Sequence, residues 1–106
     1  MPKYLIQVSY VGEGLKGLLK EVGSSRRASI ETLIKNMGGN LESFYYAFGE
    51  DDVVVIADFP DNATAAAFSL AGNASGALKA RTTILMTPEE VDEATKKTVG
   101  YRPPGR

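Results

Sequence analysis

The chain alternates between stretches in which every second residue is apolar and stretches with the spacing of a helix. Lys3–Tyr10 has the first pattern and is predicted to be a strand, as are Leu41–Phe48, Val53–Phe59 and Leu78–Met86. In Val53–Phe59 the residues between the apolar positions are apolar too, which is typical of a strand covered on both faces of a sheet. The pattern therefore predicts four strands.

Between the strands, apolar residues recur at helical spacing. The first stripe predicts a short helix that ends at Gly23. Ser24 or Ser25 is predicted to cap a second helix, which ends at Gly38-Gly39. Asp61 is predicted to cap a third helix over residues 61–74. The stripe residues of the first two helices are Leu15, Leu18, Leu19 and Val22, then Ile30, Leu33, Ile34 and Met37.

A last short helix is predicted over Pro88–Lys96. Thr87 and Glu90 have the spacing of a capping box, and Pro88 occupies the first helical position. The eleven residues 96–106 contain Lys96, Lys97, Arg102 and Arg106 and no acid, together with prolines and glycines. We interpret them as a frayed, flexible tail, and a basic binding segment is the alternative.

The most apolar part of the chain is the hairpin from Leu41 to Pro60. Simple alternation puts Phe44, Tyr46 and Phe48 on one face of its first strand and Leu41, Tyr45 and Ala47 on the other. Gly49-Glu50-Asp51-Asp52 forms an acidic turn. A sheet that is apolar on both faces needs more cover than its own helices supply, so we expect a second copy of the chain to provide it.

The order of elements is strand, helix, strand, strand, helix, strand and terminal helix. This order predicts an α+β, ferredoxin-like βαββαβ fold, in which a four-stranded antiparallel sheet carries its helices on one face and a short C-terminal helix follows. We expect residues 1–95 to be a single domain, because 106 residues suffice for one core of two layers.

Composition excludes several classes of site. The chain has no cysteine and no histidine, so thiolate chemistry, cysteine-ligated metals and the usual near-neutral base are all missing. We expect no cofactor and no metal. The net charge of −1 indicates neither a nucleic-acid nor a membrane partner, and without a signal peptide or a long apolar segment we expect a soluble cytoplasmic protein.

One motif points to a family. The run Phe44-Tyr45-Tyr46-x-x-Gly49-Glu50-Asp51-Asp52-Val53-Val54-Val55-Ile56-x-Asp58-x-Pro60 resembles the GYD domain family, and so do Gly14, an arginine at 26 or 27 and the Gly38-Gly39 exit. The similarity runs from Tyr4 to about Glu90. The chain departs from the family motif at Asp51, where an aromatic residue is expected. The resemblance implies a dimeric α/β-barrel protein of ferredoxin-like fold, and it carries no assigned catalytic residue.

Nine residues are candidates for a pocket or an interface between subunits, and catalytic residues stay unknown. They are Tyr10, Arg26, Phe44, Tyr45, Tyr46, Phe48, Asp52, Asp58 and Arg81. The tyrosines fit either a pocket lined by phenols or core and interface packing, with Tyr45 and Tyr46 facing opposite ways. Arg81 shares a strand face with Lys79 and Thr83. That face is a weak signal for RNA, and we favour solvated side chains or ion pairs between subunits, with Asp58 or Glu42 as candidate partners.

Two further motifs have simpler interpretations. Asp51 and Asp52 have the composition of a carboxylate pair, but adjacent strand residues point to opposite faces, so we interpret them as turn residues. Gly12-x-Gly14-x-x-Gly17 has the spacing of a dinucleotide-binding loop. Because a hairpin follows it, and not a parallel βαβ unit, we interpret it as a loop and the start of a weak helix.

Three functions remain open. The first is a homodimer or higher homo-oligomer that is non-catalytic or binds a small molecule. The second is a cofactor-independent enzyme, similar to monooxygenases or isomerases, whose cavity lies between sheet and helices and whose acid–base group is Asp52, Asp58, Tyr10 or Tyr45. The third is an accessory subunit of another complex. A cavity of mixed polarity that contains one of these groups would favour the second function over the first.

Overall fold

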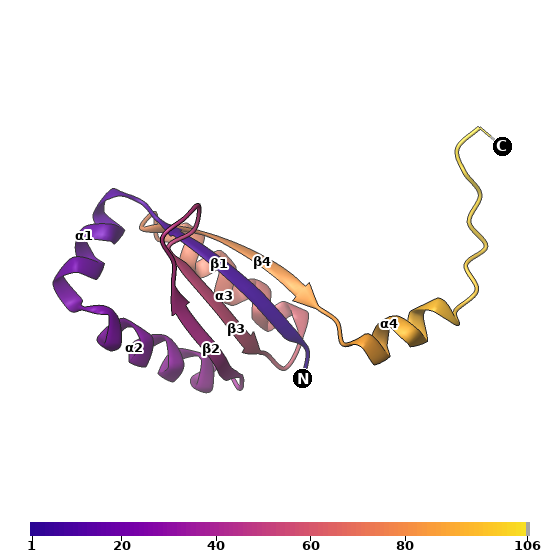
Figure 1. The fold of residues 1–106 in the computed structure, drawn as a ribbon, viewed down its shortest axis with the longest axis horizontal. Coiled ribbons are helices and arrows are strands. Elements are labelled where there is room, and N and C mark those ends of the chain that lie inside the picture. Colours follow the sequence, from indigo (N-terminus) through magenta and orange to yellow (C-terminus); the bar gives the residue numbers. More distant parts are fainter. Residues whose placement is uncertain (106) are drawn as a thin grey trace.

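A computed structural model describes residues 1–105 of the chain, so Arg106, the last base of the predicted tail, lies outside the described residues. The sheet carries α1, α2 and α3, while α4 and the residues after it run away from it (Figure 1). Along the chain the elements are β1 (Lys3–Tyr10), α1 (Gly12–Glu21), α2 (Gly23–Asn36), β2 (Asn40–Tyr46), β3 (Val53–Asp58), α3 (Asn62–Ala74), β4 (Leu78–Leu85) and α4 (Pro88–Thr95).

The sheet confirms the predicted α+β, ferredoxin-like architecture. Its strand order is β2-β3-β1-β4, and every neighbouring pair is antiparallel. The register places Ile6 between Val55 and Thr82, so these three side chains share the face that carries the helices. We call this the helix-facing side and the opposite surface the outer face.

A β-bulge in β2 corrects the predicted faces of that strand. The register shifts between Leu41 and Ser43, so Leu41 pairs with Ala57 while Phe44 pairs with Val55. One extra residue in a strand reverses the alternation beyond it. Leu41 therefore lies on the helix-facing side together with Phe44 and Tyr46, and Tyr45 points to the outer face.

The starts of α3 and α4 follow local signals, whereas α1 and α2 begin without a side-chain cap. The Asp61 carboxylate accepts a hydrogen bond of 2.8 Å from the backbone N–H of Thr64, and the predicted capping box joins Thr87 and Glu90. Hydrogen bonds from the Thr64 hydroxyl and N–H hold the pKa of Asp61 below its ordinary value. The prediction that Ser24 or Ser25 caps the second helix is wrong. That helix begins at Gly23, directly after Val22, without a side-chain cap.

The packed core occupies one end of the layer between sheet and helices. Phe59 is fully buried there, with its ring 5.8 Å from that of Tyr4 and 5.4 Å from that of Phe68. Ile34 of α2 and Ala65 of α3 close the same end. No helix within residues 1–105 is both long and apolar enough to cross a bilayer. The other end of the layer is less filled, and the candidate site lies there.

Candidate functional site

A cavity of about 550 Å³ lies between the helix-facing side of the sheet and helices α1, α2 and α3. All four strands contribute to its floor, and its walls are mainly apolar, with a few polar side chains among them. The principal side chains around it are Ile6, Val8, Tyr10, Leu18, Arg26, Ile30, Leu33, Met37, Phe44, Val53, Val55, Phe68, Leu78 and Ala80. A domain of this size normally packs its interior with few voids larger than a water molecule, so the cavity is the most distinctive feature of the fold.

Helix α3 leaves room for the cavity because its side chains are small. Ala67, Ala71 and Gly72 line the wall, where larger residues would have filled the space. Phe68 is the one large side chain of α3 at this wall. The run of alanines was visible in the sequence, but a small side chain at a helix–sheet contact is consistent with either close packing or a void. Only the position of α3 above the sheet distinguishes the two.

Helix α1 is held at its first turn by backbone contacts. The Val11 N–H donates a hydrogen bond of 2.9 Å to the carbonyl of Ala77, and Gly14 lies against the same carbonyl. A Cβ atom at position 14 would stand only 1.9 Å from the Ala77 oxygen. Beyond this point α1 buries none of its residues, and Leu15 and Leu19 face solvent. The helix thus forms one wall of the cavity with little packing of its own.

The joint between α1 and α2 is conformationally unusual. Val22 has a φ of +65°, and among the described residues it is the one non-glycine with a positive φ. A β-branched side chain disfavours this region, at a cost of about 1–3 kcal/mol. The hydroxyl of Tyr46 donates a hydrogen bond of 3.0 Å to the Gly23 carbonyl, and the Tyr46 ring contacts Gly23 closely. This contact positions the joint over the edge of the sheet.

Polar groups gather at the same side of the cavity. Arg26 and Tyr10 both line it, and an ion pair of 3.6 Å joins Arg26 to Glu21. Burial raises the pKa of Tyr46, the nearby Tyr10 raises it further, and Arg26 opposes both. Within residues 1–105 the Tyr10 hydroxyl makes no hydrogen bond. The cavity therefore combines a long apolar wall with one free phenol, the ion pair of Arg26 and Glu21, and the Glu13 side chain.

The predicted candidates divide between this cavity and other places. Tyr10, Arg26 and Phe44 line the cavity, and Tyr46 packs beside it with its ring 5.3 Å from that of Phe44. The remaining five do not line it. Tyr45 lies on the outer face with 69% of its surface exposed.

Phe48 lies in the loop between β2 and β3, outside the predicted strand, and is fully exposed. It stands apart from Phe44 and Tyr46, the aromatic residues with which we expected it to share a face. Strand β2 ends at Tyr46, so the alternation that we extended to residue 48 does not apply there.

The acidic candidates are structural. Asp52 accepts a hydrogen bond of 2.8 Å from the backbone N–H of Tyr10, which ties the hairpin turn to the end of β1. Asp51 points to the outer face and binds Arg81 at 2.7 Å. The two carboxylates therefore have separate partners, as the turn interpretation expects. Within one chain Arg81 thus pairs with Asp51, and an ion pair between subunits with Asp58 or Glu42 stays a prediction.

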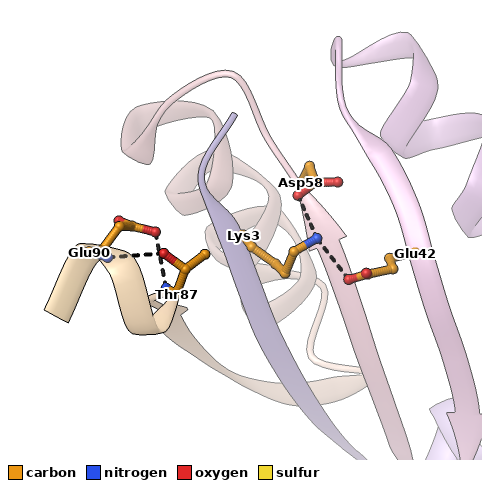
Figure 2. Close-up of polar contacts among 5 residues, drawn as sticks. All are labelled: Lys3, Glu42, Asp58, Thr87 and Glu90. Atoms are coloured by element: carbon orange, nitrogen blue, oxygen red, sulfur yellow. Dashed lines mark hydrogen bonds and ion pairs between the residues drawn. The ribbon is translucent and has the colours of Figure 1, made fainter. Parts of the chain in front are cut away.

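Asp58 and Glu42 instead share Lys3. The Lys3 ammonium lies 2.8 Å from Glu42 and 2.9 Å from Asp58, so it joins three neighbouring strands on the outer face (Figure 2). Hydrogen bonds to Glu42 and then to Asp58 raise the pKa of Lys3. Arg81 is too far along the sheet to take this place, because the register pairs it with Gln7 and not with Lys3.

The chemistry available in the cavity is limited. Apolar walls favour an apolar ligand, and Tyr10 is the one predicted acid–base candidate that lines the cavity. In the described part of the chain no three acidic side chains gather as a metal site would require. Binding by shape and burial, oriented by one or two polar groups, is what this arrangement supports.

Comparison with known proteins identifies the family. The GYD domain model matches residues 4–95 of the 106-residue chain. The match covers all four helices and all four strands, apart from Lys3 at the start of β1. No curated protein and no solved structure matches the chain. The motif, the ferredoxin-like sheet and this match agree, and the chain belongs to the GYD domain family.

Proposed function

We propose that this GYD domain is a homodimeric module that binds a small, mainly apolar molecule in the cavity between sheet and helices. The volume of about 550 Å³ carries the proposal. Pockets for small molecules commonly measure about 300–1,000 Å³, with apolar walls and a few convergent polar groups. An empty apolar space of this size would destabilise a small domain, and a ligand that fills it would offset that cost.

The ligand is expected to carry one hydrogen-bond acceptor at one end. Its apolar body would lie on Val8, Val53 and Phe44, and its acceptor would reach the unpaired hydroxyl of Tyr10. A phenol is a good donor to a carbonyl or ether oxygen. Arg26 is engaged with Glu21, so the site does not call for a strongly anionic ligand.

A probe of apolar cavities tests binding. Titration with 1-anilinonaphthalene-8-sulfonate is expected to give a saturable fluorescence increase in the wild type. Ala67→Phe places a ring in the cavity and should lower the affinity for the probe by at least about tenfold. Ala74→Phe makes the same change in the same helix, at a position that does not line the cavity, and should leave the affinity unchanged. Equal affinity in all three proteins would refute the cavity as the site.

The homodimer is proposed to form through the outer face. Phe44 and Tyr46 lie on the helix-facing side, so the surface available to a second copy of the chain is the outer face around Tyr45. Its apolar centre is Leu5, Val54, Ile56 and Leu85, and the Lys3 and Arg81 ion pairs lie at its two ends. A sheet face with such a centre is typical of an interface between copies.

Ile56→Lys tests the interface, because it puts a charge at the middle of the outer face. An unpaired charge buried in an interface costs several kcal/mol, so the dimer should dissociate about a hundredfold more readily. Sedimentation equilibrium measures the change. Thr32→Lys, on the exposed surface of α2, is the control. A wild type that sediments as one chain of 11.3 kDa would rule out the dimer.

The position of Tyr10 favours a second candidate function, a cofactor-independent enzyme. Its phenol lines the cavity and has no hydrogen-bond partner in residues 1–105, so it is free to exchange a proton with a bound substrate. Asp52 and Asp58 are engaged elsewhere and take no part. Tyr10→Phe would abolish turnover of any substrate found, whereas for a binding module it would only weaken affinity by a small factor.

A further inference from the structure

The C-terminal arm, which we define as residues 87–105, contributes no residue to the buried core of its own chain. All of its residues are exposed, and it runs away from the sheet (Figure 1). Its helix α4 has only eight residues. Isolated helices shorter than about 12–15 residues are marginal in water, and packing of an apolar face normally supplies the missing stability. Val91, Val99 and Tyr101 are the apolar side chains that the arm leaves exposed.

The start of α4 directs the arm away from its own sheet. The Thr87 N–H donates to the Glu90 carboxylate and the Glu90 N–H donates to the Thr87 hydroxyl, both at 3.1 Å (Figure 2). Pro88 follows with its fixed φ. Folding the arm back onto its own β4 would require the chain to reverse direction between Leu85 and Thr87, whereas α4 continues away from the sheet (Figure 1). The arm is therefore better placed to reach another molecule.

A matching surface lies along β4, at the edge of the sheet. A groove of about 390 Å³ runs between β4 and α3, and Leu70 and Ile84 border it with 68% and 50% of their surfaces exposed. The Thr82 hydroxyl also lines the groove. It is buried and has no hydrogen-bond partner within the described residues. An unpaired edge strand beside such a groove is a surface that proteins normally cover.

The charges of the arm and of this edge are opposite. Helix α4 contains four acids, Glu89, Glu90, Asp92 and Glu93, and no base. Strand β4 contains Lys79 and Arg81 and no acid, and α3 contains no charged residue. Lys79 has no ion pair in residues 1–105. Both bases project from the outer face, with Arg81 paired to Asp51, while the groove opens on the helix-facing side. A helix that lies along the β4 edge places its acids toward these bases and Val91 toward the apolar groove.

We propose that the C-terminal arm of one copy lies along the β4 edge of a second copy, over the groove between α3 and β4. Val91 packs against Leu70 and Ile84 of that copy, and the acids of α4 face its Lys79 and Arg81. In a dimer with two-fold symmetry the exchange is reciprocal, so two equivalent contacts form. The inference rests on the self-association proposed above and adds a contact at the β4 edge, beside the outer-face residues Lys79 and Arg81.

Charge exchange between two variants tests whether the contact forms between copies. One variant is Lys79→Glu/Arg81→Glu, and the other is Glu89→Lys/Asp92→Lys. Each homodimer then opposes like charges, and we expect its dissociation constant to rise about tenfold or more. In the mixture both reciprocal contacts are attractive. Native mass spectrometry should therefore find the heterodimer above its statistical share of one half.

A matched control is Arg27→Glu/Lys35→Glu, which makes the same changes on α2, over the opposite edge of the sheet. It should dimerise like the wild type. Wild-type affinity in both test variants, or a statistical mixture, would overturn the arm contact while leaving the outer-face dimer in place. A wild type that is monomeric throughout would overturn both. Neither result bears on the proposed ligand site in the cavity, because binding of the fluorescent probe there is measured separately.

Discussion

The close approach of Gly14 to Ala77 makes a strong prediction about α1. In Gly14→Ala the new methyl group would lie 1.9 Å from the Ala77 oxygen and 2.8 Å from its carbonyl carbon. Cβ atoms in proteins essentially never come within 3.0 Å of another heavy atom, so α1 and the loop before β4 must separate by about 1 Å. Backbone stands on both sides of the contact, and no flexible side chain can move aside.

The cost can be worked out from the groups involved. Overpacking costs about 1–3 kcal/mol, and stretching the hydrogen bond from Val11 to Ala77 costs a further 0.5–1.5 kcal/mol or so. The higher helix propensity of alanine offsets about 1 kcal/mol of this loss of stability. We therefore expect Gly14→Ala to lower the free energy of unfolding by about 1–3 kcal/mol. Gly17→Ala in the same helix meets no atom within 4 Å and should raise that free energy by about 0.5–1 kcal/mol.

Urea unfolding followed by far-ultraviolet circular dichroism measures both variants. With a slope of about 1–3 kcal/mol per molar urea, the two midpoints should differ by about 1 M, with Gly14→Ala below the wild type and Gly17→Ala above it. Protein concentration must be equal throughout, because association stabilises the folded state. If Gly14→Ala unfolds at the same midpoint as Gly17→Ala, α1 does not rest on Ala77 and the wall of the cavity is placed incorrectly.

Three other changes test the joint, the core and the outer face. Val22→Gly removes an unfavourable φ from an exposed residue and should raise the free energy of unfolding by about 1 kcal/mol; a loss of stability in urea would contradict the strained joint. Phe59→Ala empties the centre of the core and should cost about 3–5 kcal/mol by the same assay, so a change below 1 kcal/mol or so would show that the ring is not buried. The pKa of Lys3 is higher in the folded chain than its unfolded value of 10.5, so its contribution is complete below that pH and is lost as pH rises through the folded pKa. Lys3→Met should therefore lose less stability than the wild type as pH rises from 10.5 through the folded pKa of Lys3, and identical pH profiles would count against the ion pairs with Glu42 and Asp58.

Much of the fold follows from local sequence. The alternation in Lys3–Tyr10 and Val53–Phe59 and the caps at Asp61 and Thr87 depend on residues within a few positions of one another, and each predicted element exists. Their order then restricts the topology, because short connections favour antiparallel neighbours. The family match over residues 4–95 rests on the same one-dimensional information.

What depends on residues far apart in the chain was decided by the tertiary structure. The bulge between Leu41 and Ser43 reverses the faces of β2, because pairing with β3 determines the register and alternation alone cannot. The ion pair between Asp51 and Arg81 joins the turn before β3 to the middle of β4, so no local pattern indicates it. The cavity arises in the same way. Small side chains on α3 become a wall only when α1 and α2 stand off from the sheet beside them, and helix placement is a property of the whole layer, not of any one segment.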